Sequence, residues 1–111
     1  MASDELLDRL RSIAQANYPL VKEKLSSVDQ VFVLKLNDNG SYIIKVNSST
    51  LSIEPGSHAS PLATLVTSSA DLRAMLDGQM DAVKAFFQGK VQIQGDVFKT
   101  MVLNSLIRGA H

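Results

Sequence analysis

The chain has 111 residues, and eleven Lys and Arg residues balance eleven Asp and Glu residues, so its formal net charge is zero. Hydrophobic residues make up 45% and charged residues 20% of the sequence, which is typical of a folded domain and excludes a disordered chain. The sequence has no cysteine, which excludes disulfides, thiolate metal sites and cysteine catalysis. A balanced charge also argues against nucleic acid as a partner, because phosphate binding needs a net basic surface.

The length predicts a single domain over residues 1–111, with no internal repeat or linker. The sequence starts acidic, opposite to the basic start of a signal peptide. No apolar run approaches the ~18 residues that a membrane span requires. We therefore expect a cytoplasmic protein.

Residues 4–25 are expected to form a helix. Pro19 lies inside this segment, and a proline removes one helical hydrogen bond and clashes with the preceding turn. We therefore expect a break or a kink there. The apolar positions that recur near the helical period are Leu6, Leu10, Ile13, Ala14, Val21 and Leu25.

Residues 31–36 and 41–46 are expected to form a β-hairpin. A two-residue turn would mix polar and apolar side chains on each face. A three-residue loop over 38–40, with its glycine in the left-handed conformation, sets Leu34 opposite Ile44 and makes one face wholly apolar. Burial of one face is what specifies register, so we expect this loop. The expected pairs are Leu36 with Tyr42, Leu34 with Ile44, and Phe32 with Val46.

The rest of the chain alternates short strands and short capped helices. Ser68 and Asp71 resemble a capping box, and Asp81 and Asp96 are expected to cap the two helices that follow them. The elements expected are strands at 50–54, 62–67 and 90–94, and helices at 72–77, 82–88 and 97–108. This order predicts an α+β fold of two layers, in which a five-stranded, mainly antiparallel sheet is covered on one face by helices.

The sequence lacks the motifs of common catalytic and metal sites. No phosphate-binding glycine loop and no nucleophile elbow occurs. The two histidines, His58 and His111, stand in an expected loop and at the last position, without a carboxylate at metal-ligand spacing. We therefore expect no catalytic residues, no bound metal and no cofactor.

The segments 72–87 and 97–107 carry more apolar residues than a single helix stripe needs. One interpretation is that these side chains form the core of the domain. The other is that they line a cavity for a lipid tail, which three flexible methionines at 75, 80 and 101 would suit. The residues alone leave both interpretations open.

Two runs in this half resemble a known family. Residues 71–80 read D-L-R-A-M-L-D-G-Q-M, and residues 85–96 read A-F-F-Q-G-K-V-Q-I-Q-G-D. They are similar to the sterol carrier protein type 2 domain, whose pattern is a D-L-x-x-L/M-x-x-G helix followed by an F-x-x-G-K-x-x-x-x-G-D strand. The sequence resemblance is good over residues 62–107. In the N-terminal half, only the order of the expected helices and strands agrees with the family.

The resemblance implies a non-catalytic domain with a hydrophobic tunnel that binds a sterol, a fatty acid or a fatty acyl-CoA. It also implies turn glycines at 78, 89 and 95, and core-facing side chains at Val91 and Ile93. Amphipathicity then selects the expected lipid-binding residues. These are Met75, Leu76, Met80, Phe86, Phe98, Met101 and Val102.

Three functions are compatible with the sequence. The first is a module that binds or transfers a lipid, with transient contacts to a membrane or an enzyme. The second is an accessory subunit that presents an apolar substrate, such as an isoprenoid-quinone precursor or an alkyl chain, to a partner enzyme. The third is a dimerisation module, in which the apolar helices form the interface of a homodimer.

Overall fold

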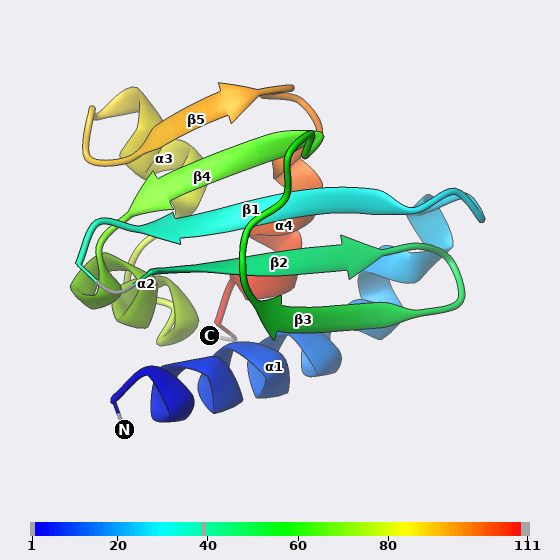
Figure 1. Ribbon diagram of the computed structural model, residues 1–111, viewed down its shortest axis with the longest axis horizontal. Helices are drawn as coiled ribbons and strands as arrows, with labels where there is room; N and C mark the ends of the chain where they lie inside the picture. Colours follow the sequence, from blue (N-terminus) through cyan, green and yellow to red (C-terminus); the bar gives the residue numbers. More distant parts are fainter. Residues whose placement is uncertain (1, 39, 110–111) are drawn as a thin grey trace.

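The computed structural model describes residues 2–38 and 40–109 of the chain. The strands form one sheet in the spatial order β3-β2-β1-β4-β5 (Figure 1). All neighbouring pairs are antiparallel except β1 and β4, which run parallel. The strands are β1 (Gln30–Leu36), β2 (Gly40–Val46), β3 (Leu51–Pro55), β4 (Ala63–Thr67) and β5 (Gln92–Gly95).

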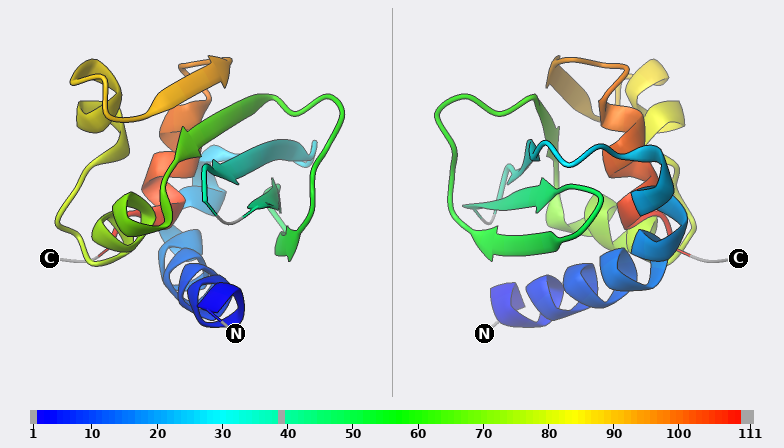
Figure 2. Two further views of the ribbon diagram at one scale, coloured as in Figure 1. Left: turned by 60° about the vertical axis from the view of Figure 1, so that its left-hand side comes forward. Right: turned by 90° about the vertical axis from the view of Figure 1, so that its right-hand side faces the viewer.

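The helices lie on one face of this sheet, as the sequence predicts (Figure 2). They are α1 (Ala2–Val21), the short 3-10 helix η1 (Lys22–Lys24), α2 (Ser69–Leu76), α3 (Ala82–Phe87) and α4 (Thr100–Ile107). In the described part of the chain, the other face carries no helix. The loop from β3 to β4 crosses it instead (Figure 1), so that β4 enters beside β1.

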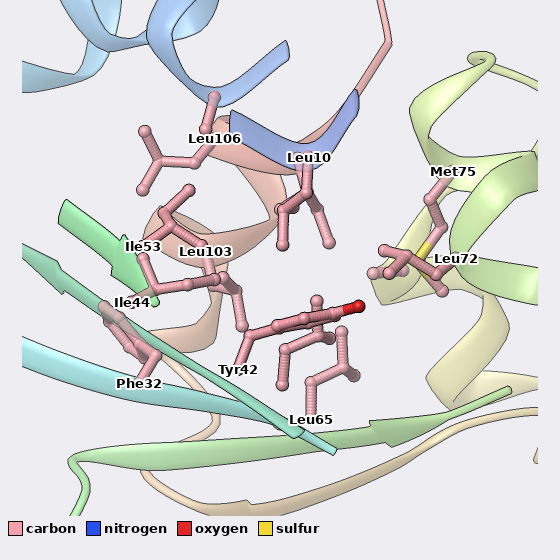
Figure 3. Close-up of a cluster of buried hydrophobic side chains, with 14 of the residues drawn as sticks. Leu10, Phe32, Tyr42, Ile44, Ile53, Leu65, Leu72, Met75, Leu103 and Leu106 are labelled. Atoms are coloured by element: carbon pink, nitrogen blue, oxygen red, sulfur yellow. The ribbon is translucent and has the colours of Figure 1, made fainter. Parts of the chain in front are cut away.

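The core lies between the helices and the inner face of the sheet (Figure 3). Alternate residues of the strands point inward, because successive side chains of a strand face opposite sides. The buried strand residues include Phe32, Leu34, Ile44, Ile53 and Leu65. The helix residues that pack on them include Leu6, Leu10, Leu72, Met75, Leu103 and Leu106.

The hairpin register differs from the prediction by two residues. The loop has three residues, as expected, but they are 37–39, and Leu34 lies opposite Tyr42 instead of Ile44. The predicted pairs of Leu36 with Tyr42 and Phe32 with Val46 are wrong for the same reason. Gly40 does take the expected left-handed conformation, with φ +78°, and Asn39 lies outside the described residues.

The reason for the different register lies on the other side of β1. A shift of two residues keeps the same side chains on the inner face, so burial does not distinguish the two registers. The N–H of Asn37 donates to the carbonyl oxygen of Thr67 at 2.8 Å, at the end of β4. Asn37 is thereby bonded to β4, the parallel neighbour of β1. The pairing of β1 with β2 therefore ends at Leu36, one residue before the end that the sequence predicts.

The predicted break at Pro19 does not occur. The helix α1 runs through Pro19 to Val21 and only then tightens into η1. Pro19 stands in the last turn, where the missing N–H removes one hydrogen bond and few residues follow. The ribbon bends near this end of α1 (right panel of Figure 2), as the kink alternative expects.

Two of the three predicted helix caps, Ser68 and Asp81, are confirmed, whereas the prediction that Asp96 caps the last helix is wrong, because Asp96 caps a turn ahead of α4. The N–H of Asp71 donates to Ser68 Oγ at 3.1 Å, and the N–H groups of Val83 and Lys84 donate to Asp81 Oδ1. The N–H of Lys99 donates to Asp96 Oδ1 at 3.1 Å. Residues 97–99 form a separate turn, so α4 starts three residues later than expected.

Candidate functional site

A groove of about 660 Å³ lies between the C-terminal part of α1 and α4. Its apolar lining residues are Leu20 and Val21 on α1 and Met101 and Val102 on α4. This volume is within the usual range for sites that hold small molecules. The groove is therefore large enough for a lipid chain.

The walls of the groove are unusual in their exposure. Leu20 is 76% and Met101 57% exposed, whereas Val21 is only 6% exposed and Val102 is half-buried. Two large apolar side chains thus stand open to solvent over a buried apolar floor. Contiguous exposed apolar surface commonly marks a place where a ligand or a partner binds.

The polar side chains of the groove are Asn17, Lys24, Ser105 and Arg108. Two of them are cations, and none of the residues that line the groove is acidic. An apolar lining with a few polar groups is the usual composition of a pocket that orients an amphipathic ligand.

The end wall of the groove is a segment of main chain held against α2. The N–H of Gly109 donates to the carbonyl oxygen of Met75 at 2.9 Å. A Cβ atom at Gly109 would overlap the carbonyl oxygen of Leu76 and lie 2.6 Å from the nitrogen of Gly78. Only glycine fits this close approach, so the end wall has a fixed position relative to α2.

Two ion pairs join α1 to the region of α2 at the opposite end of α1 from the groove. Arg9 pairs with Asp77, and Arg73 Nη1 lies 3.3 Å from Glu5 Oε1. Both pairs are partly exposed, so each contributes little stability by itself.

Asp81 is the acidic side chain that interacts with Arg108. Partial burial opposes ionisation of Asp81, but hydrogen bonds from the N–H groups of Lys84 and Val83 and from the Asn104 side chain outweigh this, so the pKa of Asp81 is lowered. The carboxylate of Asp81 therefore accepts hydrogen bonds from the first N–H groups of α3.

The comparison with known families decides the identity of the fold. The model of the SCP-2 sterol transfer family matches residues 10–108, which is nearly the whole chain. The chain belongs to the SCP-2 sterol transfer family. Curated relatives agree: sterol carrier protein 2 of Rattus norvegicus is 29% identical over 90 residues, which cover 77% of this chain. The match covers only 16% of that relative, so the chain spans about a sixth of its length.

Solved structures show the same SCP-2 fold. The palmitated SCP2L2 of Aedes aegypti is 23% identical, with a TM-score of 0.67, and the match covers 95% of this chain and 98% of that one. A UbiJ-SCP2 ubiquinone synthesis protein is 16% identical, with a TM-score of 0.61, over 79% of this chain and 75% of that one.

The glycines of the SCP-2 motif take the conformation that turns require. Gly78, Gly89 and Gly95 have φ of +78°, +77° and +93°. Val91 is buried and Ile93 is half-buried against the core, as the resemblance implies.

The seven lipid-binding residues predicted for this SCP-2 domain do not gather at one place. Met101 and Val102 line the groove, whereas Met75 and Leu76 are buried in the core (Figure 3 shows Met75 there). Phe98 is 84% exposed, outside the lining of the groove. The other two, Met80 and Phe86, are half-buried against the core.

The sequence pattern does not predict the α1 side of the groove. Leu20 and Val21 fall in an expected helix and not in an expected site, and Asn17, Lys24 and Arg108 belong to no motif. One signal is present: Leu20 is a large apolar residue at the edge of the apolar stripe of its helix and not at the centre of the stripe. Such a residue is exposed when the stripe packs on the core.

Two other features of residues 2–38 and 40–109 are less suited to a lipid. A second hollow of about 220 Å³ is lined mainly by polar side chains, Arg11, Gln15, Ser52 and Glu54, with Leu51 and Ile53. His58 is exposed in the β3–β4 loop, where its Nδ1 accepts from the N–H of Ser60. His111 lies outside the described residues.

Within residues 2–38 and 40–109, no group of three or more metal-ligating side chains comes together. In the same part of the chain, no helix combines the length and the apolar character needed to cross a membrane.

Proposed function

We propose that this chain holds the apolar chain of a lipid, such as a sterol, a fatty acid or a fatty acyl-CoA, in the groove between α1 and α4. The observation that carries the proposal is the pair of exposed apolar walls, Leu20 and Met101, over the buried floor at Val21. Membership of the SCP-2 family supports it, as does a solved neighbour that is palmitated. The role is binding, and we propose no reaction for the groove.

The site proposed here includes Met101 and Val102 from the seven residues predicted from sequence, together with Leu20 and Val21. The groove is open on the side of Leu20, so a lipid would lie along α4 with one side toward solvent. Such a site would allow the lipid to enter and leave without opening the core.

The energetics of chain burial set the size of the expected effect. Each buried methylene contributes about 0.8 kcal/mol, so a hexadecanoyl chain has roughly 10 kcal/mol of gross driving force. Ordering and association leave about 7–8 kcal/mol, or a Kd of ~1–10 μM. At ~100-fold excess over Kd, binding stabilises the fold by about 2.7 kcal/mol and raises Tm by on the order of 10 °C.

The test is thermal unfolding with saturated fatty acids from butanoate to octadecanoate, each kept below the concentration at which it forms micelles. We expect Tm to rise with chain length and to change little with butanoate, which buries few methylenes. A Tm that is independent of chain length would overturn the lipid-binding proposal and favour the dimerisation module.

A second candidate is an accessory role, in which the lipid is presented to a partner enzyme. The similarity to a UbiJ-SCP2 ubiquinone synthesis protein favours it. The two roles differ in whether the loaded protein binds a specific enzyme. Affinity capture with the lipid-loaded protein should retain such an enzyme, and the empty protein should retain less of it; equal recovery would count against this role.

A further inference from the structure

The charges around the groove distinguish between lipid head groups. Lys24 and Arg108 both line the groove, and none of its lining residues is acidic. The chain as a whole is neutral, so this concentration of positive charge belongs to the groove and not to the average composition.

The two cations have no ion-pair partner among the described residues. The ion pairs in that part of the chain are those of Arg9 and Arg73. The acid that interacts with Arg108 is Asp81, whose Oδ1 accepts two N–H groups at the start of α3. Glu23 lies beside Lys24 on η1, but it does not line the groove.

A different explanation for Lys24 and Arg108 is that they offset the negative ends of their helices, since basic residues are favoured at helix C-termini. At the end of α4, however, two carbonyl groups accept hydrogen bonds from a neutral side chain. Asn17 Nδ2 donates at 2.8 Å to the carbonyl oxygens of both Leu106 and Arg108. These two carbonyls thus take their hydrogen bonds from an amide and not from the guanidinium of Arg108.

We infer that the α1–α4 groove holds the anionic head group of a single-chain lipid between Lys24 and Arg108, and therefore prefers such lipids to uncharged alcohols and sterols. This inference rests on the proposed function. The apolar walls supply affinity for the chain, and the two cations supply selectivity for the head. A carboxylate and the phosphates of an acyl-CoA share the required negative charge.

The size of the effect follows from the exposure of the site. Exposed ion pairs are individually weak, so the loss of one cation should weaken binding about two- to fivefold. The loss of both should weaken it about tenfold. Added salt should weaken the binding of an anionic lipid, because the Debye length shortens to about 3 Å at 1 M. It should not weaken the binding of an alcohol of the same chain length.

The experiment is calorimetric titration of the purified protein with hexadecanoate, hexadecanol and hexadecanoyl-CoA, all below micellar concentrations. We expect the wild type to bind hexadecanoate about tenfold more tightly than hexadecanol. The Lys24→Gln/Arg108→Gln variant should bind the two equally. Lys22→Gln is the matched control, because Lys22 is exposed on the same short helix but does not line the groove.

Two further variants separate charge from folding. Arg108→Lys keeps the charge and should bind hexadecanoate almost as the wild type does. Lys24→Gln alone changes an exposed side chain, and it should retain the Tm of the free protein while losing two- to fivefold in affinity. If the double variant loses more affinity for hexadecanoate than for hexadecanoyl-CoA, the carboxylate contacts the two cations. A larger loss for hexadecanoyl-CoA would assign this contact to the phosphates.

The outcomes keep the two proposals apart. Equal affinity of the wild type for hexadecanoate and hexadecanol would overturn the head-group inference and leave the proposed function intact. Binding of neither lipid would overturn the proposed function, and the inference with it. An equal loss of affinity in Lys22→Gln would show a general charge effect and would overturn the assignment to Lys24 and Arg108.

Discussion

Asn17 on α1 holds the main chain of Arg108, ninety-one residues later, through a hydrogen bond of 2.8 Å from its Nδ2 to the carbonyl oxygen. The same nitrogen donates to the carbonyl oxygen of Leu106. The last carbonyl groups of a helix have no partner within the helix, and here one side chain provides for two of them. The groove between α1 and α4 is therefore closed at this end by a specific contact.

Replacing Asn17 by Asp should destabilise the fold. The aspartate has the same shape but no N–H donor, so it loses both hydrogen bonds and sets a carboxylate against two carbonyl oxygens. We expect the free energy of unfolding in urea to fall by about 2 kcal/mol. Gln15→Glu makes the same chemical change at an exposed position of α1 and should cost less than about 0.5 kcal/mol. Equal losses in the two variants would contradict this role of Asn17.

Gly109→Ala should destabilise more than Gly89→Ala. The methyl group at position 109 would overlap the main chain after α2, and relieving such a contact costs roughly 1–3 kcal/mol. At position 89 there is open space, and the cost is about 1 kcal/mol for a left-handed alanine. Urea unfolding of both variants measures the difference. A smaller loss at position 109 than at position 89 would show that the end wall can move.

Engineered cysteines should report the register of the hairpin. Lys35 lies opposite Ser41 on the helix-free face of the sheet, whereas the register expected from sequence sets it opposite Ile43. The chain has no cysteine of its own, so a disulfide is unambiguous. We expect Lys35→Cys/Ser41→Cys to oxidise readily and Lys35→Cys/Ile43→Cys to oxidise slowly, since Cα atoms must approach within about 7 Å. The reverse order would favour the shifted register.

The hairpin shows what a sequence can and cannot predict about this fold. Alternation identifies which face of β1 and β2 is buried, because one residue of slip would expose every apolar side chain. It does not distinguish registers two residues apart. That choice depends on the bond from Asn37 to Thr67, which comes from a strand thirty residues later. Capped helices are predicted better, because Ser68 and Asp81 act on N–H groups two or three residues away.

The groove was harder to predict than the fold. One wall could be found from the excess of apolar residues near Met101, since a single helix face need not hold so many. The other wall depends on how α1 lies along α4, which no local pattern specifies. Met75 and Leu76 have the same amphipathic pattern as Val102, yet they fill the core. Pattern alone does not separate residues that line a hollow from those that fill one.

The cap of α3 should make part of the stability depend on pH. Hydrogen bonds in the folded state lower the pKa of Asp81 below its value in the unfolded chain, about 3.9. The ionised carboxylate therefore stabilises the fold above about pH 4, and this contribution is lost as the pH falls through the folded-state pKa. We expect Asp81→Ala to cost about 1 kcal/mol at pH 7 and less at pH 3.

The control for that experiment is the cap of α2. Ser68→Ala removes a cap of similar strength that does not titrate. Its cost, measured by urea unfolding at the same pH values, should stay constant. A constant cost for Asp81→Ala as well would mean that the charge of Asp81 contributes nothing to the cap.

Met101→Glu should abolish lipid binding, whereas Phe98→Glu should not. Both side chains are exposed, so both variants should fold, and they lie one helical turn apart. Met101 lines the groove and Phe98 does not. A carboxylate at position 101 would have to be desolvated beside the lipid chain, which costs several kcal/mol, enough to weaken a micromolar Kd to about the millimolar range.

The measurement is the rise in Tm on adding hexadecanol, chosen because an uncharged head avoids repulsion between the ligand and the new carboxylate. We expect the rise to disappear in Met101→Glu and to remain in Phe98→Glu. Met101→Leu, which keeps an apolar wall of similar volume, should retain most of it. Loss of the rise in Phe98→Glu with retention in Met101→Glu would place the lipid at Phe98, in the turn before α4, and not in the groove against α1.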